Sequence, residues 1–171
     1  MISPANFAPL FDEYHPKLYA YIRSQVADRD TAEDLTASAF ERAFSRSHQF
    51  DETKASFATW LFRIGRNLVL DHYAAVSRKP ALYDLEEVGP VSTQALSPEQ
   101  QLLQQEQLQL LLDTMATLPA RDQEILRLRF FGQLTNRKIA AVMDINEKTI
   151  SVIILRALRK IKAKVRDKET A

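Results

Sequence analysis

Cysteine is absent from this chain of 171 residues, and glycine occurs only three times. The lack of cysteine excludes a disulfide framework and thiol chemistry, and it fits a reducing cytoplasm. The scarcity of glycine and of β-branched runs between turn residues predicts an all-helical chain. No apolar run reaches the roughly 18 residues that a membrane span needs, and residues 1–10 lack the pattern of a secretory signal. We therefore expect a helical protein of the cytoplasm without a membrane span.

Acidic and basic residues are distributed unevenly along the chain. Residues 1–119 contain 10 Lys/Arg and 16 Asp/Glu, a net charge of −6, whereas residues 120–171 contain 13 and 6, a net charge of +7. A basic C-terminal part fits a polyanionic ligand such as nucleic acid. The charge alone is equally consistent with a solvated basic helix.

Apolar residues at three- and four-residue steps predict two helices at the start of the chain. The first covers residues 7–26, and Pro16 inside it predicts a kink or a break into two helices. A capping box formed by Thr31 and Asp34 predicts the start of the second helix, which runs to about Arg46.

A polar loop at residues 47–55 separates these helices from a third, at residues 54–76, which carries a strong apolar stripe. Residues 78–97 have no helical period and are rich in proline, so we interpret them as a linker. This linker divides the chain into an N-terminal domain, residues 1–77, and a C-terminal domain, residues 98–171.

The C-terminal domain has the outline of a helix-turn-helix. Pro98, preceded by Ser97 as N-cap, begins one helix, and Pro119 begins another. Within residues 134–164, Thr135 or Asn136 caps a short helix, and Asn146 caps a long helix that starts at Glu147. The long helix is apolar on one side and basic on the other, as a recognition helix must be.

Three motifs follow one another along the chain. They are residues 32–40 (AEDLTASAF), residues 57–67 (FATWLFRIGRN) followed by Asp71, and Leu118-Pro119 with Leu128-Arg129 and residues 148–157. In this order and spacing they resemble the extracytoplasmic-function group of the sigma-70 family. The resemblance covers roughly residues 5–80 and 95–165.

This resemblance implies a non-catalytic subunit that binds the largest subunits of core RNA polymerase and directs the enzyme to promoter DNA. It implies sigma region 2 at residues 1–77, for polymerase binding, −10 recognition and melting, and sigma region 4 at residues 98–171, for −35 recognition. An anti-sigma factor that clamps both domains is a further implied partner. No cofactor, metal or small-molecule substrate is implied.

The first motif matches the helix that docks on polymerase in this family. The chemistry of its residues suits that task, since carboxylates can meet basic partner groups while apolar side chains anchor the helix. The alternative for the acidic residues is to stabilise the helix N-terminus, which attracts anions. Ala37 stands where the family usually has Gln, so one polymerase contact is lost or replaced. The predicted contact residues are Glu33, Asp34, Leu35, Ala37, Phe40 and Glu41.

The second motif resembles the element that binds the −10 box, where a base must leave the stack and enter a pocket. Asn67 offers both a donor and an acceptor to a base edge. Phe57 and Trp60 lie on the apolar stripe and are interpreted as core aromatics. The predicted −10 residues are Phe50 and Lys54 of the pocket rim, Arg63 and Arg66 for phosphates, Asn67, and Asp71 of the motif.

The third motif places the last helix in the major groove of the −35 box. The predicted contact residues there are Arg129, Lys138, Lys148, Thr149, Ser151, Val152 and Arg156. Lys138 replaces the family's usual Glu and can reach a phosphate. The stretch Ser151-Val152-Ile153 replaces basic and polar residues, and its apolar side chains can touch thymine methyls but cannot hydrogen-bond to guanine. We therefore expect an A·T-rich −35 preference or weak −35 recognition.

A dimeric helix-turn-helix regulator that acts without polymerase is the nearest alternative. It explains residues 120–166 but gives no purpose to the helix at residues 54–76 or to the helix after Thr31. A helical adaptor with no role on DNA is disfavoured by the C-terminal charge of +7.

A helical metal-dependent hydrolase is an alternative from another class. Its histidines, His15, His48 and His72, lie far apart in sequence, and no pair has the i, i+4 spacing of a zinc site. The chain also lacks a glycine-rich loop that would cradle phosphates.

Overall fold

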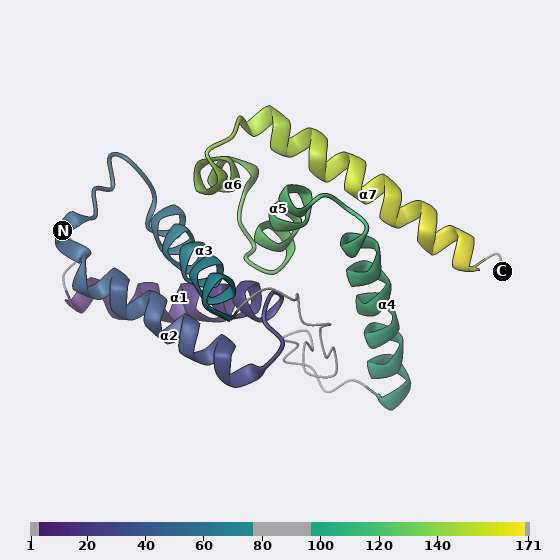
Figure 1. Ribbon diagram of the computed structural model, residues 1–171, viewed down its shortest axis with the longest axis horizontal. Coiled ribbons are helices and arrows are strands. Elements are labelled where there is room, and N and C mark those ends of the chain that lie inside the picture. The colour runs from purple at the N-terminus through teal and green to yellow at the C-terminus, as the bar shows by residue number, and fades with distance from the viewer. Residues whose placement is uncertain (1–3, 77–96, 170–171) are drawn as a thin grey trace.

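The computed structural model describes residues 4–76 and 97–169, and both segments are built of helices joined by short loops (Figure 1). The elements are α1 (Pro4–Arg23), α2 (Arg29–Ser45), the 3₁₀ turn η1 (Ser47–Gln49), α3 (Phe57–Val76), α4 (Pro98–Ala116), α5 (Ala120–Phe130), α6 (Asn136–Met143) and α7 (Glu147–Glu169). Neither described segment contains a strand, which confirms the all-helical prediction. Apart from Ser97, the predicted linker lies outside the described residues. None of the described helices is long and apolar enough to cross a membrane.

Helices α1, α2 and α3 contact one another in pairs and form an N-terminal three-helix unit (Figure 1). The buried side chains of this unit include Leu18, Tyr21, Ile22, Ala39, Leu61 and Phe62. Gly65 of α3 faces α1 closely, because a Cβ at this position would lie 2.8 Å from Leu18 Cδ1. The missing side chain therefore lets the two helices cross at short range.

Helix α1 continues through Pro16, so the predicted break into two helices is wrong. Proline removes a backbone donor and crowds the preceding turn, which disfavours a helix interior. Here the cost falls on an exposed position, while the residues just after it, Leu18, Tyr21 and Ile22, are completely buried. Packing of that buried face outweighs the local penalty.

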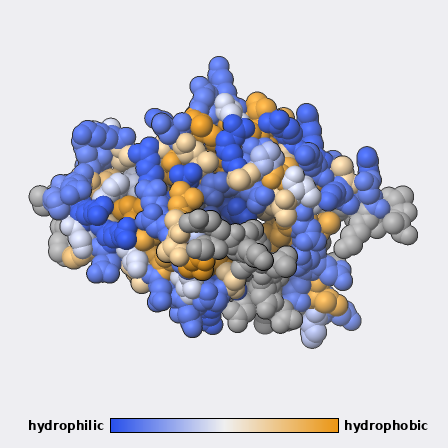
Figure 2. Space-filling model, in the orientation of Figure 1, coloured by the Kyte–Doolittle hydropathy of each residue, from blue (hydrophilic) through white to orange (hydrophobic). Residues whose placement is uncertain are grey.

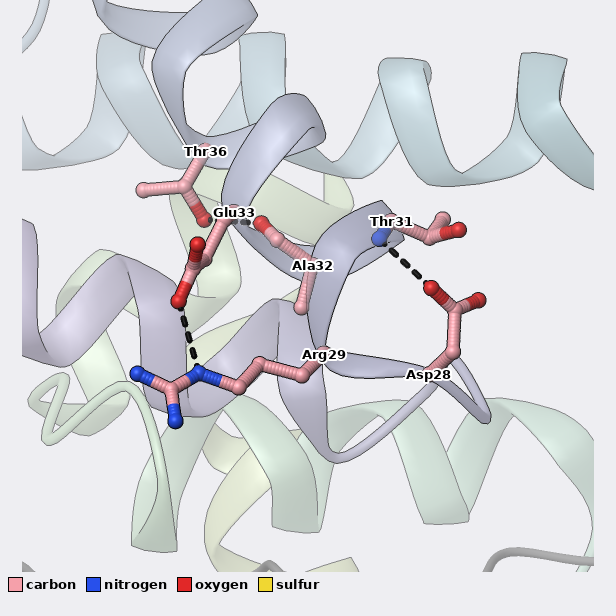
Figure 3. Close-up of polar contacts among 6 residues, drawn as sticks. All are labelled: Asp28, Arg29, Thr31, Ala32, Glu33 and Thr36. Atoms are coloured by element: carbon pink, nitrogen blue, oxygen red, sulfur yellow. Dashed lines mark hydrogen bonds and ion pairs between the residues drawn. The ribbon is translucent and has the colours of Figure 1, made fainter.

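The N-cap of helix α2 lies three residues before the predicted one (Figure 3). Its N-cap is Asp28, whose Oδ1 accepts the Thr31 backbone N–H at 2.7 Å. Ala32, which the prediction placed at the first helical position, lies one turn into the helix, where it is fully buried and its carbonyl accepts the Thr36 hydroxyl at 2.7 Å. The predicted Thr31–Asp34 box is therefore wrong, and Asp34 has no capping duty. The end of α2, with Arg46 as its C-cap, is as predicted.

The C-terminal unit consists of α4 to α7, with α7 in contact with each of the other three helices. Thr135 Oγ1 accepts the Lys138 N–H at 3.3 Å and caps α6, and Asn146 Oδ1 accepts the Lys148 N–H at 2.8 Å and caps α7. Asp144 takes the left-handed conformation, with φ of 55°, in the turn between these helices. Aspartate tolerates this conformation better than most residues. The predicted helix-turn-helix is thus confirmed.

The two units also contact each other, because α3 packs against α6. Figure 1 shows α3 of the N-terminal unit beside α5 and α6. The face of the molecule drawn in Figure 2 is mainly hydrophilic, with hydrophobic residues in small areas between charged ones. On this face, apolar surface is therefore exposed only in small areas.

The cap at Asp28 generates a stability prediction. Replacing Asp28 with Ala should lower the free energy of unfolding by about 1 kcal/mol, because one orphan N–H of the helix loses its acceptor. Asp34→Ala is the matched control and should change stability by less than about 0.5 kcal/mol. Urea denaturation followed by circular dichroism measures both, and equal losses would favour the Thr31–Asp34 box instead.

The same cap predicts a pH effect. Hydrogen bonds from Thr31 lower the pKa of the Asp28 carboxyl below its usual value. The stabilisation from Asp28 is therefore complete above the pKa of the unfolded chain and is lost as pH falls through the folded pKa. The stability gap between wild type and Asp28→Ala should accordingly close in acid.

Candidate functional site

Helix α2 presents an exposed acidic face to solvent. Glu33, Asp34, Ala37 and Glu41 are exposed, as the predicted polymerase contact requires. Arg29 Nε donates to Glu33 Oε1 at 2.8 Å, but both side chains are more than half exposed. An exposed i, i+4 pair of this kind is worth only about 0.3–0.5 kcal/mol, so Glu33 can exchange Arg29 for another cation at little cost.

The apolar anchors of α2 differ from those predicted. Phe40 is only 4% exposed and packs against Phe7 and Phe11 of α1, so its predicted anchoring contact is corrected to a role in the core. Leu35 is partly buried against the same core. Phe44, by contrast, is 48% exposed beside the acidic face. Its ring packs edge-on against the ring of Phe7, with 5.1 Å between the ring centroids. The sequence analysis missed Phe44. Its position four residues after Phe40, on nearly the same side of the helix, was the signal that could have identified it.

The loop before α3 is ordered by Asp51. Its Oδ1 accepts the Thr53 N–H at 3.0 Å and the Thr53 hydroxyl at 2.6 Å, and these hydrogen bonds lower the pKa of the Asp51 carboxyl. Lys54 lies 3.6 Å from Asp51 Oδ2 and is largely exposed. The side chains of Phe50 and Lys54, predicted as the pocket rim, are thus presented by a short structured turn.

Aromatic rings line the junction between this loop and α3. The Phe50 ring lies 5.1 Å from the Trp60 ring at an interplanar angle of 35°, and both residues are half-buried. Phe57 is 8% exposed beneath them, which confirms it as a core aromatic. Asn67 and Asp71 are exposed and follow Trp60 by seven and eleven residues, which places all three on one face of α3. The amide of Asn67 makes no hydrogen bond to the residues that the structure describes.

Arg63 and Arg66, predicted to hold −10 phosphates, are directed to the C-terminal unit in this structure. Arg63 donates to the Ala141 carbonyl of α6, with a distance of 3.1 Å from Nε. Arg66 Nε lies 3.5 Å from Glu124 Oε1 of α5. These two cations therefore have protein partners, whereas the Asn67 amide makes no hydrogen bond within residues 4–76 and 97–169.

A basic face runs along the first half of α7. Lys148, Val152, Arg156 and Arg159 are exposed and follow one another at four- and three-residue steps, so they lie along one side of the helix. Val152 is 59% exposed and stands among the three cations. Thr149 and Ser151 flank this side, and both are exposed. Asn136 of α6 donates to the Ser151 hydroxyl at 3.2 Å and ties the helix-turn-helix together.

Burial and hydrogen bonding distinguish three further positions of the C-terminal unit, and the DNA contacts of Arg129 and Lys138 stay predictions. Ile153 is 1% exposed and belongs to the core of the C-terminal unit, so the prediction that it touches thymine is wrong. Arg129 is exposed, but its Nη1 donates to the Leu134 carbonyl at 3.0 Å and braces the loop before α6. Lys138 is half-buried in the first turn of α6.

No group of three or more histidine and carboxylate side chains is placed to hold a metal ion among the described residues. The described residues form three separate exposed surfaces. The surface on α2 is acidic with an aromatic side chain, the surface on α3 carries an amide and aromatic rings, and the surface on α7 is basic with an apolar residue at its centre.

Two family models match this chain. Residues 10–79 match sigma-70 region 2, and residues 114–163 match sigma-70 region 4. The chain is also 32% identical to the extracytoplasmic-function (ECF) RNA polymerase sigma factor RpoE of Cereibacter sphaeroides, over 92% of this chain and 85% of that protein. This chain belongs to the ECF sigma factors. It is an alternative sigma factor, a subunit for promoter-specific initiation of transcription.

A further relative is the ECF sigma factor BldN of Streptomyces coelicolor, with 36% identity over 90% of this sigma factor. The match spans 58% of the length of BldN. Among solved structures, the sigma factor RpoE in complex with the anti-sigma factor NepR, from Bartonella quintana, is similar with a TM-score of 0.67. That match covers 94% of this sigma factor and 97% of the other chain at 19% identity, so it supports the fold.

Two apolar residues of α7 that are adjacent in sequence differ in burial, since Val152 is exposed and Ile153 is buried. Ile153→Ala should lower the free energy of unfolding by about 2–5 kcal/mol, because it opens a cavity in the core. Val152→Ala removes an exposed side chain and should change stability by less than about 0.5 kcal/mol. Urea denaturation measures both variants. Similar losses for the two would mean that α7 is rotated from the orientation described.

Proposed function

We propose that this sigma factor divides promoter recognition among its three exposed surfaces. Helix α2 binds core RNA polymerase, the loop at residues 50–56 with α3 binds the −10 element, and α6 with α7 binds the −35 element. The N-terminal unit then corresponds to residues 1–77 and the C-terminal unit to residues 98–171. The observation that carries this proposal is that family membership and three chemically distinct exposed surfaces coincide in one chain.

The surface on α2 suits a partner helix with basic and apolar side chains. Glu33, Ala37, Glu41 and Phe44 follow one another at three- and four-residue steps, so they form one exposed strip. Small Ala37 lets a partner helix approach closely, carboxylates on either side meet cations, and Phe44 supplies an apolar anchor of the kind that dominates interface energies. Such a strip fits a coiled coil of the polymerase.

The surface on α3 suits an unpaired base. Unstacking a base costs a few kcal/mol, and stacking on an aromatic ring returns about 1–3 kcal/mol per base. Phe50 and Trp60 supply half-buried rings, and the Asn67 amide supplies a donor and an acceptor on the same face of α3. This combination fits capture of a −10 base from the melted strand.

The surface on α7 suits duplex DNA. Lys148, Arg156 and Arg159 can neutralise phosphates, which sets affinity and its salt dependence. Val152, exposed among them, can contact a thymine methyl but cannot hydrogen-bond to guanine. We infer a −35 element in which an A·T pair faces Val152.

The protein acts without catalytic activity of its own and in the cytoplasm, where its polymerase resides. We also propose regulation by an anti-sigma factor. Support for this step comes from the structural relative that was solved with the anti-sigma factor NepR.

The division of labour is tested by transcription from a promoter library with core polymerase. Asn67→Ala should lower open-complex formation, measured by fluorescence of 2-aminopurine in the −10 element, while binding of the closed complex persists. Arg156→Ala should weaken binding on all templates and reduce the salt slope by about 1, without changing the preferred sequence. If both variants behave alike on every template, the assignment of these surfaces is wrong.

The polymerase surface is tested by Phe44→Ala. Loss of this exposed ring should weaken the affinity for core polymerase by about tenfold, since truncating an interface anchor costs upward of 1 kcal/mol. Leu102→Ala, which truncates a 59% exposed apolar residue on α4, is the matched control. Surface plasmon resonance with immobilised core polymerase measures both. An affinity for Phe44→Ala equal to that of wild type would exclude Phe44 from the interface.

A further inference from the structure

Two apolar side chains lie on the solvent side of α7. Val152 is 59% exposed and Leu155 is 52% exposed, whereas Ile150, Ile153 and Ile154 of the same helix are buried. Each residue turns an α-helix by about 100°, so Val152 and Leu155 lie only about 60° apart and opposite the three buried isoleucines. We call Val152 and Leu155 the apolar pair. It forms the centre of the exposed face of α7, where the fold does not need it.

Cations lie at both ends of the apolar pair. Lys148 is four residues before Val152 and Arg159 is four residues after Leu155, and both cations are exposed on the same side of the helix. Helices α4, α5 and α6, which α7 contacts, lie together on the other side of α7 (Figure 1). The exposed face therefore offers a ligand two apolar groups with a positive charge at each end.

The major groove of duplex DNA has the chemistry that this face requires. Phosphates border the groove on both sides, and the methyl group of thymine is the apolar group that a base presents inside it. Helix α7 is also the second helix of the helix-turn-helix, the one that enters the major groove in this motif. Leu155 continues the face that carries Lys148 and Val152, so the proposed −35 surface extends to it without a break.

The spacing of the apolar pair suits two neighbouring base pairs. Residues three positions apart are separated by about 4.5 Å along a helix axis, and successive base pairs are about 3.4 Å apart along the duplex. Residues 148–155 rise by about 10.5 Å, which fits within a major groove about 12 Å wide. Val152 and Leu155 can therefore lie in the groove together.

We propose that Leu155 is a specificity-determining residue, which packs against the methyl group of a thymine next to the A·T pair that faces Val152. The −35 element then contains two adjacent A·T pairs. This proposal rests on the proposed binding of α7 to the −35 element. Leucine neither donates nor accepts a hydrogen bond through its side chain, so it distinguishes bases by apolar contact alone. One methyl group of the DNA should therefore control the contribution of Leu155.

Exchange of thymine for uracil tests this contact, because uracil lacks only the methyl group. A promoter selected from a library with core polymerase supplies the −35 element, and each of its A·T pairs is converted to A·U in turn. Competition with a fluorescently labelled promoter measures the affinity of the sigma factor bound to core polymerase. We expect two adjacent positions at which uracil weakens binding about fourfold, the effect of one methyl-sized group left unburied. Uracil between the −35 and −10 elements should leave the affinity unchanged.

Variants of the apolar pair assign each position to a residue. Leu155→Ala should abolish the uracil effect at one position and Val152→Ala at the other. Leu155→Met should keep the effect, because methionine retains a flexible apolar side chain. Leu102→Ala, which truncates a 59% exposed leucine on α4, is the matched control and should keep both effects. Circular dichroism verifies the helical content of each variant.

Three results would overturn the role of Leu155. They are a −35 element without two adjacent A·T pairs, a uracil effect that persists in Leu155→Ala, and an equal loss of affinity for thymine and uracil promoters in that variant. The last result would mean that Leu155 meets a protein surface instead.

Arg156→Ala distinguishes this proposal from the proposed function. This variant should weaken binding to thymine and uracil promoters by the same factor, because its contact is to phosphate. Unchanged binding of Arg156→Ala would remove the −35 surface as a whole. Weakened binding of Arg156→Ala without any uracil effect would remove only the contact of Leu155.

Discussion

Helix α3 is packed from two sides, and this constraint governs what the rest of the protein can present. One side, with Leu61, Phe62 and Gly65, lies in the core with α1 and α2. A second side, with Arg63 and Arg66, meets α5 and α6 through hydrogen bonds and an ion pair. The remaining face carries Asn67 and Asp71. A helix held in this way cannot rotate to expose other residues, so the position of Asn67 is fixed by the burial of Phe62.

Features that depend on neighbouring residues were predictable from the sequence, and those that depend on distant ones were not. The cap of α7 was found and that of α6 was narrowed to Thr135 or Asn136, because an N-cap acts on N–H groups two or three residues away. The start of α2 was misjudged because Asp28 and Thr31 are both good N-caps, and the choice between them shows only in the hydrogen bond from the Thr31 N–H to Asp28. The contacts of Tyr21 and Arg66 with Glu124 join residues far apart in sequence and follow no periodic pattern, so no sequence motif predicted them.

The candidate DNA surface of α7 also depends on contacts that the sequence does not show. A predicted helix assigns Val152 and Ile153 to faces about 100° apart, since each residue turns the helix by that angle. Which of the two faces solvent depends on how α7 packs against α4, α5 and α6, and the structure buries Ile153 and exposes Val152. The apolar stretch in the recognition helix therefore divides into one residue for the core and one for a ligand. The motif resemblance was enough to locate α7, but its packing in the structure determines that Val152 is the exposed residue.

The interface between the two units includes a polar contact, in which Glu124 of α5 meets Tyr21 of α1 and Arg66 of α3. When the units separate, Tyr21, Arg66 and Glu124 regain water, and the net loss for a hydrogen bond exchanged in this way is about 0.5–1.5 kcal/mol. If the same interface were apolar, separating the units would cost roughly 25 cal/mol for each Å² of apolar area exposed to water. It would also leave an exposed hydrophobic patch on each unit, where other proteins could bind. The contact of one carboxylate with two partners is instead polar and directional. The Glu124 contact is therefore weak evidence for stability, because desolvation of the three groups offsets much of their attraction.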